Sequence, residues 1–196
     1  MLAGRAAVGR CRNRPGGESD VAKLARVVEL RPGMQVAEIG AGDGGMALGV
    51  ARRLGPSGRL YATEIDSGSL ETIRRRARAE GLDNIVTVEA EEHSTALPAE
   101  CCDLIYMHRV YHHLTDAASV DRSLLASLKP GGRLAVVDML IQPWMPARRH
   151  GIAENELIAQ LTRAGFVVEK QVNGWSMLDY CVVFRKPPPG RAASTR

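Results

Sequence analysis

The segment MHRVYHHL, residues 107–114, holds the densest group of side chains able to do acid–base chemistry. Three of the five histidines of the chain lie there, His108, His112 and His113, with Tyr111 between them. Histidine titrates near neutral pH, so it can act as a general base. We expect His108, His112 and Tyr111 to be the catalytic candidates, with His108 in the best position. The competing interpretation is that these side chains only fill space beneath a substrate pocket.

The same histidines raise the question of a metal site. Two metal ligands on one helical face need an i, i+4 spacing, which His108 and His112 have. If a helix begins near Val110, however, the junction between strand and helix falls between them. His112 and His113 would then point about 100° apart, so they could not serve equally. We therefore predict no bound metal.

A glycine-rich loop, VAEIGAGDGG at residues 36–45, places four glycines within six positions. Gly40, Gly42 and Gly44 permit positive φ angles and remove side chains that would block a ligand. A helix beginning here would point its N-terminal amides at the same place. The spacing fits both G-x-G-x-G and G-x-G-x-x-G, and the second is the fingerprint of dinucleotide binding.

Two carboxylates help to choose the ligand. Glu64 follows Gly44 by twenty positions and ends a predicted strand, where it could accept both hydroxyls of a ribose. Glu38 precedes the glycines, where it would repel a pyrophosphate but attract a cationic amino acid. This pair favours S-adenosylmethionine over NAD(P), and a nicotinamide-dependent oxidoreductase remains the alternative enzyme class.

Apolar runs alternate with helical patterns along the chain, which predicts an α/β fold with a mostly parallel sheet. The expected strands are Gln35–Ile39, Arg59–Thr63, Ile85–Val88, Leu104–Met107, Leu134–Asp138, Phe166–Glu169 and Tyr180–Phe184. The expected helices are Val21–Leu30, Gly44–Leu54, Ser67–Glu80, Ala117–Leu128 and Glu154–Ala164. No helical pattern separates the last two strands, so we expect a hairpin with an antiparallel last strand. Ligands of such sheets bind at the carboxyl ends of the strands.

Length and composition are ordinary for one globular domain. The chain has 196 residues, 24% charged residues and a net charge of +4. We predict a flexible segment at 1–19, a domain at 20–186 and a tail at 187–196. Residues 1–17 contain no acidic residue and four arginines, which leaves a targeting segment as an alternative to a disordered start. No run of about 18 apolar residues occurs, so we expect no membrane span.

The four cysteines form no C-x-x-C pair. They are Cys11, Cys101, Cys102 and Cys181. Reduced thiols in a cytoplasmic protein are the expectation. A soft-metal or arsenic role for the adjacent pair Cys101–Cys102 is the weaker alternative.

Four motifs occur in an order that resembles class I S-adenosylmethionine-dependent methyltransferases. They are VAEIGAGDG, LYATEID, LP followed by CCDLIYM, and LKPGGRLAVVD. The resemblance covers roughly residues 20–185 and looks nearest to the small-molecule type, which includes quinone-biosynthesis methyltransferases. It implies a three-layer Rossmann-like fold, S-adenosylmethionine as methyl donor, and donor contacts from Glu38, Gly40, Ala41, Gly42, Gly44, Glu64, Ile65, Glu91, Glu92 and His108.

Within that set, the resemblance implies that Glu91 accepts a hydrogen bond from the adenine amino group. Glu92 is the alternative if the register is off by one. The N-P-P-Y type motif of amino-group methyltransferases is absent after the fourth strand, which favours an oxygen or carbon acceptor on a small organic molecule.

Trp144 and Met145, in QPWMPARRH, could close over this acceptor, or a second subunit of a homodimer could complete the pocket. Nucleic acid is disfavoured as a partner, because no aromatic-rich basic stretch is present. A non-catalytic donor-binding protein is the third alternative.

Overall fold

A seven-stranded sheet forms the centre of the protein. The computed structural model describes residues 19–141 and 151–188, and its strand order is β3-β2-β1-β4-β5-β7-β6. The strands are β1 (Gln35–Ile39), β2 (Arg59–Glu64), β3 (Ile85–Glu89), β4 (Cys102–His108), β5 (Leu128–Met139), β6 (Val167–Val172) and β7 (Asp179–Arg185).

The sheet is mostly parallel, as the sequence predicts. Strands β1 to β5 pair in parallel, and β7 is antiparallel to both β5 and β6. The link between β6 and β7, residues 173–178, is too short for a crossover helix, so the chain reverses. The antiparallel last strand is therefore confirmed, and it lies between β5 and the edge strand β6.

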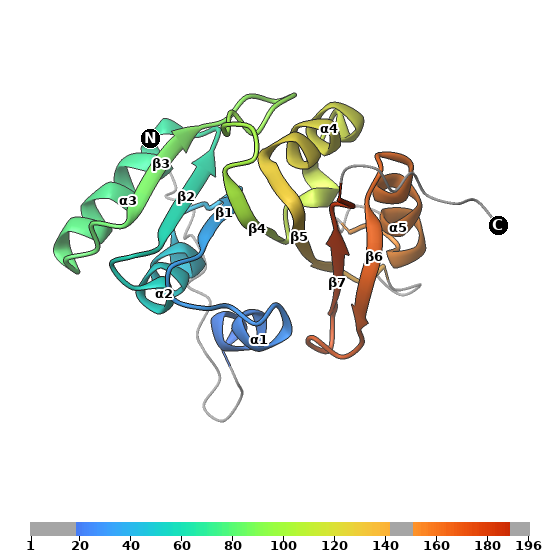
Figure 1. Ribbon diagram of the computed structural model, residues 1–196, viewed down its shortest axis with the longest axis horizontal. Helices are drawn as coiled ribbons and strands as arrows, with labels where there is room; N and C mark the ends of the chain where they lie inside the picture. The colour runs from blue at the N-terminus through green and yellow to red at the C-terminus, as the bar shows by residue number, and fades with distance from the viewer. Residues whose placement is uncertain (1–18, 142–150, 189–196) are drawn as a thin grey trace, which may run out of the picture.

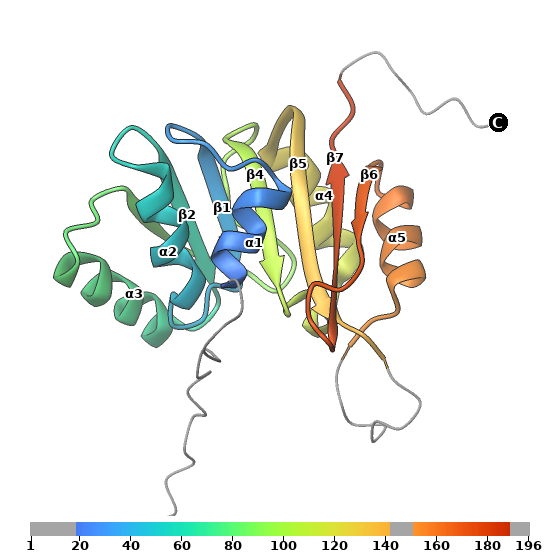
Figure 2. The ribbon, with the colours of Figure 1, turned by 90° about the horizontal axis from the view of Figure 1, so that it is seen from below.

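Helices cover both faces of the sheet and produce three layers (Figures 1 and 2). One face carries α1 (Asp20–Val27), α2 (Gly45–Leu54) and α3 (Ser67–Ala79), which bury Leu24, Val50 and Leu70 in one apolar cluster. The other face carries α4 (Ala117–Ser127) and α5 (Glu154–Arg163), which bury Leu124 and Leu157 in a second cluster. No helix in the described ranges is long and apolar enough to cross a membrane.

Two local predictions differ from the structure. The helix expected near Val110 is only a 3-10 turn, Tyr111–His113, because Leu114 is extended and Asp116 then caps α4 by accepting from the Ser119 amide. Strand β5 begins six residues before the predicted Leu134, at Leu128. The segment KPGG, whose residues are typical of a turn, lies within this strand.

Candidate active site

The glycine loop after β1 leaves its outer surface bare. Gly40, Gly42 and Gly44 have φ angles of 69°, 53° and 81°. A Cβ atom on Gly40 would approach Val110 to 2.7 Å, and one on Gly44 would approach Leu48 to 2.8 Å. A Cβ on Gly42 would meet nothing within 4 Å. Packing therefore requires the outer two glycines, whereas Gly42 faces open space from which a ligand can approach the main chain.

Glu64, at the end of β2, is held beside this loop. Its carboxylate accepts hydrogen bonds from the Gly42 amide at 2.9 Å and from the Ile65 amide at 2.8 Å. The Ala41 amide donates to the Thr63 carbonyl at 2.9 Å, which fixes the loop against β2. The sequence-predicted residues of β1 and β2 thus meet, and the carboxylate is oriented before any ligand binds.

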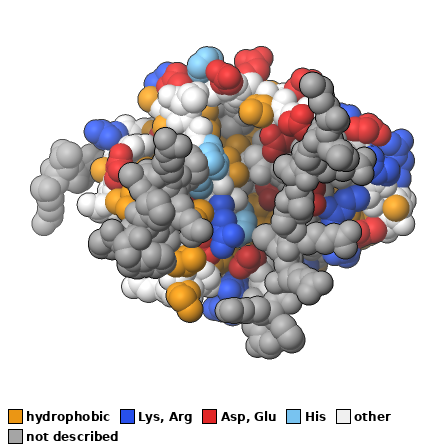
Figure 3. Space-filling view, turned by 180° about the vertical axis from the view of Figure 1, so that it is seen from behind, with side chains coloured by type: hydrophobic (Ala, Val, Ile, Leu, Met, Phe, Trp, Pro, Cys, Tyr) orange, Lys and Arg blue, Asp and Glu red, His pale blue; other side chains and the backbone are white. Residues whose placement is uncertain are grey.

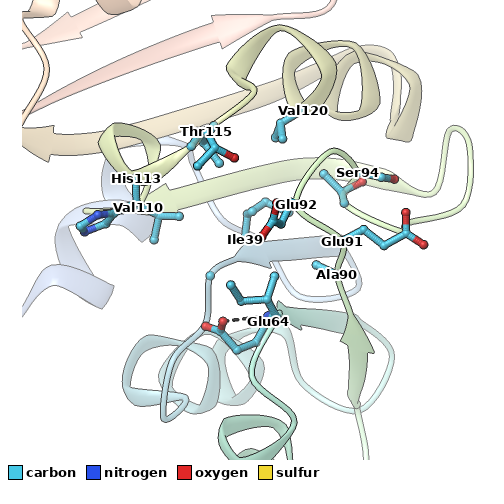
Figure 4. A pocket seen from close by; sticks show the side chains of 14 residues that line it. Ile39, Glu64, Ala90, Glu91, Glu92, Ser94, Val110, His113, Thr115 and Val120 are labelled. Carbon is cyan, nitrogen blue, oxygen red and sulfur yellow. Dashed lines mark hydrogen bonds between the residues drawn. The ribbon is translucent and has the colours of Figure 1, made fainter.

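A pocket of about 190 Å³ opens at the carboxyl ends of β1, β2 and β3. Five predicted residues line it, namely Gly40, Glu64, Ile65, Glu91 and Glu92. Figure 4 shows how these side chains gather with those of β1 and of the segment after β4. The sequence reasoning missed the other lining residues, which are Ile39, Ala90, Ser94, Thr95, Val110, His113, Leu114, Thr115 and Val120.

The two candidates for the adenine amino group differ in orientation. Glu91 is fixed by two backbone hydrogen bonds with Ser94, at 3.1 and 3.3 Å. In Figure 4 the Glu91 carboxylate points away from Ile39 and Glu64. Glu92, the candidate of the alternative register, is therefore the acidic side chain nearer the pocket interior.

Glu38 lies outside this pocket and is buried, with 4% of its surface exposed. The Tyr106 hydroxyl of β4 donates to its Oε2 at 2.9 Å. The pKa of Glu38 is raised to about 8, chiefly by burial and also by the nearby carboxylates of Asp43 and Glu64, while the hydrogen bond from Tyr106 opposes this rise. Without a cation beside it, such a carboxyl group tends to hold its proton near neutral pH.

His108 ends β4 on the face covered by α1. Its Nε2 lies 3.5 Å from Asp20 Oδ2, and its side chain is 19% exposed. The neighbouring histidine is the largest cause lowering the pKa of Asp20. His108 therefore contacts the first turn of α1, on the same side of the sheet as Glu38.

His112 lies on the other side, against the end of β5. Its Nδ1 is 2.6 Å from Asp138 Oδ1, and these two side chains are 4% and 0% exposed. The Asp138 carboxylate also accepts from the amides of Met139 at 2.6 Å and His112 at 3.3 Å. The ring of His112 lies 4.0 Å, between centroids, from that of His113, which lines the pocket.

Tyr111 points into the core beneath α4 and α5. Its hydroxyl donates at 3.0 Å to Asp121 Oδ2 and lies 3.1 Å from Gln160 Oε1. Burial and the neighbouring Asp121 raise the pKa of Tyr111. The three predicted catalytic side chains therefore do not converge, because each contacts a different buried or half-buried carboxylate.

In residues 19–141 and 151–188, no group of three or more His, Cys, Asp or Glu side chains is arranged to hold a metal ion. His93, in the loop after β3, is 65% exposed. Trp144, Met145 and His150 lie outside the described residues.

This arrangement of helices, sheet and glycine loop is that of the methyltransferase class. The fold resembles a SAM-dependent methyltransferase from Aquifex aeolicus, with a TM-score of 0.77, 24% identity, and 85% of this chain and 89% of that one covered. The family described as "Methyltransferase domain" matches residues 37–134, half of the chain. The chain therefore belongs to the methyltransferase-domain family.

Curated relatives match the same part of the chain. The ubiquinone/menaquinone biosynthesis C-methyltransferase of Vibrio vulnificus is 30% identical over 109 residues, which is 55% of this chain and 42% of that protein. The protein-L-isoaspartate O-methyltransferase of Methanothermobacter thermautotrophicus is 31% identical over 116 residues, 59% of this chain and 51% of that protein. The chain thus spans about half the length of these relatives.

Proposed function

We propose that the protein transfers a methyl group from S-adenosylmethionine to an oxygen or carbon atom of a small organic acceptor. The observation that carries this proposal is the pair of carboxylates around a bare glycine loop. Glu64 is oriented beside the pocket, and Glu38 lies buried behind the loop, where the Tyr106 hydroxyl donates to it. A cationic amino acid suits that position, whereas a diphosphate would meet a carboxyl group.

We assign the pocket at the ends of β1, β2 and β3 to the adenosine half of the donor, because Glu64, Ile65 and Glu92 line it. In the proposed arrangement Glu64 accepts the ribose hydroxyls, Ile65 covers the adenine, and Glu92 accepts from the adenine amino group. The methionine half then passes over Gly42 toward Glu38. Gly40, Ala41 and Gly44 shape the loop, and His108 contacts the donor from the end of β4.

Methyl transfer from a sulfonium is an in-line displacement with a good leaving group. Holding donor and acceptor in line can contribute about 7–11 kcal/mol in favourable cases. A general base adds about 10²–10⁴-fold where the acceptor must lose a proton.

We assign that base to His112 rather than His108. Asp138 binds His112 Nδ1, which fixes the orientation of the ring. Asp138 also stabilises the imidazolium that forms when the ring takes a proton. Asp138 is a positioning residue in this arrangement, and Tyr111 has a structural role.

Other properties follow from composition and surface. Acidic and basic side chains both occur on the face in Figure 3, which disfavours nucleic acid as a partner. Cys101, Cys102 and Cys181 are free thiols, which supports a cytoplasmic location. A homodimer would provide further cover for the acceptor.

The test is incubation of the protein with donor labelled in its methyl group and a metabolite extract. We expect a labelled small molecule whose formation needs the intact protein. Donor binding without any labelled product, from extracts of several sources, would instead support a non-catalytic donor-binding protein.

Glu64→Ala should weaken donor binding about 5–150-fold, because the ribose hydroxyls lose a partner worth about 1–3 kcal/mol. Isothermal titration with S-adenosylhomocysteine measures the change. Glu89→Ala is the matched control, since Glu89 faces Glu64 in the register of β2 and β3 but does not line the pocket. Equal affinities of Glu64→Ala and wild type would refute the assignment.

Glu92→Ala should weaken binding of S-adenosylhomocysteine about 5–30-fold, the effect of one lost hydrogen bond of about 1–2 kcal/mol. Glu91→Ala should leave it near the wild-type value. The same titration compares the two variants directly. The opposite order would restore the first register, in which Glu91 binds the adenine.

A further inference from the structure

Two adjacent thiols stand at the start of β4, at the other end of that strand from the donor pocket. The Sγ atoms of Cys101 and Cys102 are 2.6 Å apart. Cys102 is buried and Cys101 is half-buried. No part of the proposed methyl transfer uses them.

The backbone turns both thiols to the same side of the sheet. Neighbouring side chains of a regular strand point to opposite faces. Ile105 and Met107 pack in the second apolar cluster, so strict alternation would place Cys102 on the opposite face, with Leu104. The pairing of β4 with β5 is irregular between Cys102 and Leu104, where β5 advances from Leu128 to Arg133, and Cys102 joins the second cluster, against which Cys101 also packs. A local irregularity of this kind re-aims a side chain.

Two ordinary uses of cysteine pairs do not suit this geometry. Adjacent Cα atoms across a trans peptide are about 3.8 Å apart, whereas disulfides usually need about 4.4–6.8 Å. No cis peptide occurs in the described residues. A tetrahedral metal site needs further ligands, and the described part of the chain supplies no group of three. A linear two-coordinate metal with bonds of about 2.3 Å would need sulfurs about 4.6 Å apart.

We propose that Cys101 and Cys102 form a binding site for trivalent arsenicals. Such a centre, R–As=O, needs only two thiols and bonds them at a bent angle. Two As–S bonds form, the oxygen leaves as water with the two thiol protons, and arsenic stays trivalent. The ring that results is one atom larger than that of a disulfide between neighbours, so it tolerates the trans peptide.

The two thiols have different parts in this reaction. Cys101 is the entry point because it is half-exposed. Burial and the neighbouring thiol raise the pKa of Cys102, so the second bond forms within the complex of the first. The site lies at the amino end of β4, and the inference does not depend on methyltransferase activity.

The test uses phenylarsine oxide on the full-length native protein, with mass spectrometry and a count of free thiols. We expect one adduct per chain and the loss of two reactive thiols. The adduct should survive excess 2-mercaptoethanol and be reversed by 2,3-dimercaptopropanol. An adduct removed by the monothiol, or no adduct on the folded protein, would overturn the proposal.

Variants separate the pair from the other cysteines. Cys101→Ser, at the half-exposed position, should abolish the monothiol-resistant adduct while thermal unfolding stays cooperative, and Cys102→Ser should do the same. Cys181→Ser and Cys11→Ser are the controls and should retain it. A resistant adduct in Cys101→Ser that disappears in Cys181→Ser or Cys11→Ser would contradict the site.

Discussion

Glu38→Gln should be more stable than the wild type at alkaline pH and should bind the donor poorly. The pKa of Glu38 rises from 4.5 to about 8 in the folded protein, chiefly through burial. The folded state therefore holds a proton that the unfolded state releases. This contribution to stability is fully present below about pH 4.5 and is lost as pH rises through about 8.

The size of this change in the free energy of unfolding follows from the shift in the pKa of Glu38. At about 1.4 kcal/mol per pKa unit, ionising Glu38 in the folded protein costs on the order of 5 kcal/mol. The glutamine is neutral at every pH and keeps an oxygen that can accept from Tyr106. Chemical denaturation of both proteins at pH 4 and pH 9 should give similar free energies of unfolding at the lower pH and a variant several kcal/mol more stable at the higher.

Donor binding should change in the opposite direction. A charge-assisted contact to the ammonium group, worth about 1.5–3 kcal/mol, is lost in Glu38→Gln, so affinity should fall about 10–150-fold. Wild-type affinity should increase as pH approaches 8, since the bound cation requires the ionised carboxylate. Parallel stability curves for the two proteins from pH 4 to 9 would contradict the proposed proton on Glu38.

His112→Gln should lower kcat about 10²–10⁴-fold with an acceptor that must lose a proton, and should leave donor affinity unchanged. The physical reason is the orientation of the imidazole by Asp138, at 2.6 Å from Nδ1. The measurement is steady-state kinetics on the acceptor found with the labelled donor. The pH dependence of kcat should lose its acidic limb in the variant.

Two further variants test whether the loss of kcat arises from the imidazole of His112. Asp138→Asn keeps the shape but not the charge, so it should retain the fold and shift the acidic limb of the pH profile. Tyr111→Phe removes a hydroxyl that contacts Asp121 and Gln160 and should reduce stability with little change in kcat. A normal kcat in His112→Gln together with a low kcat in Tyr111→Phe would reverse the assignment.

Local patterns were enough to predict most of the fold. The strands are short apolar runs bounded by glycine, proline and acidic residues, so the structure confirms β1 at Gln35–Ile39 and, apart from the start of β5, places the others within about three residues of prediction. The antiparallel strand followed from the missing crossover helix. KPGG has residues typical of turns, and it lies where β5 shifts register against β4, between Leu128, which pairs with Cys102, and Arg133, which pairs with Leu104.

The site was only partly predictable. Glu64 and the glycines could be identified from their spacing in the sequence, because binding one ligand requires that spacing. The contacts of Tyr111 with Asp121 and Gln160 depend on how α4 and α5 pack, which no local pattern encodes. The environment of His112 likewise depends on Asp138, twenty-six residues away. The lining residues Leu114, Thr115 and Val120 gave no signal, since they resemble ordinary loop and helix residues.

The most direct test of the central claim is isothermal titration of the wild-type protein with S-adenosylhomocysteine and, separately, with NADH and NADPH. The loop between Glu38 and Glu64 should bind the homocysteine compound, and Glu64→Ala should weaken that binding. Neither nicotinamide nucleotide should bind. Saturable binding of NADH or NADPH, with none of S-adenosylhomocysteine, would contradict the account.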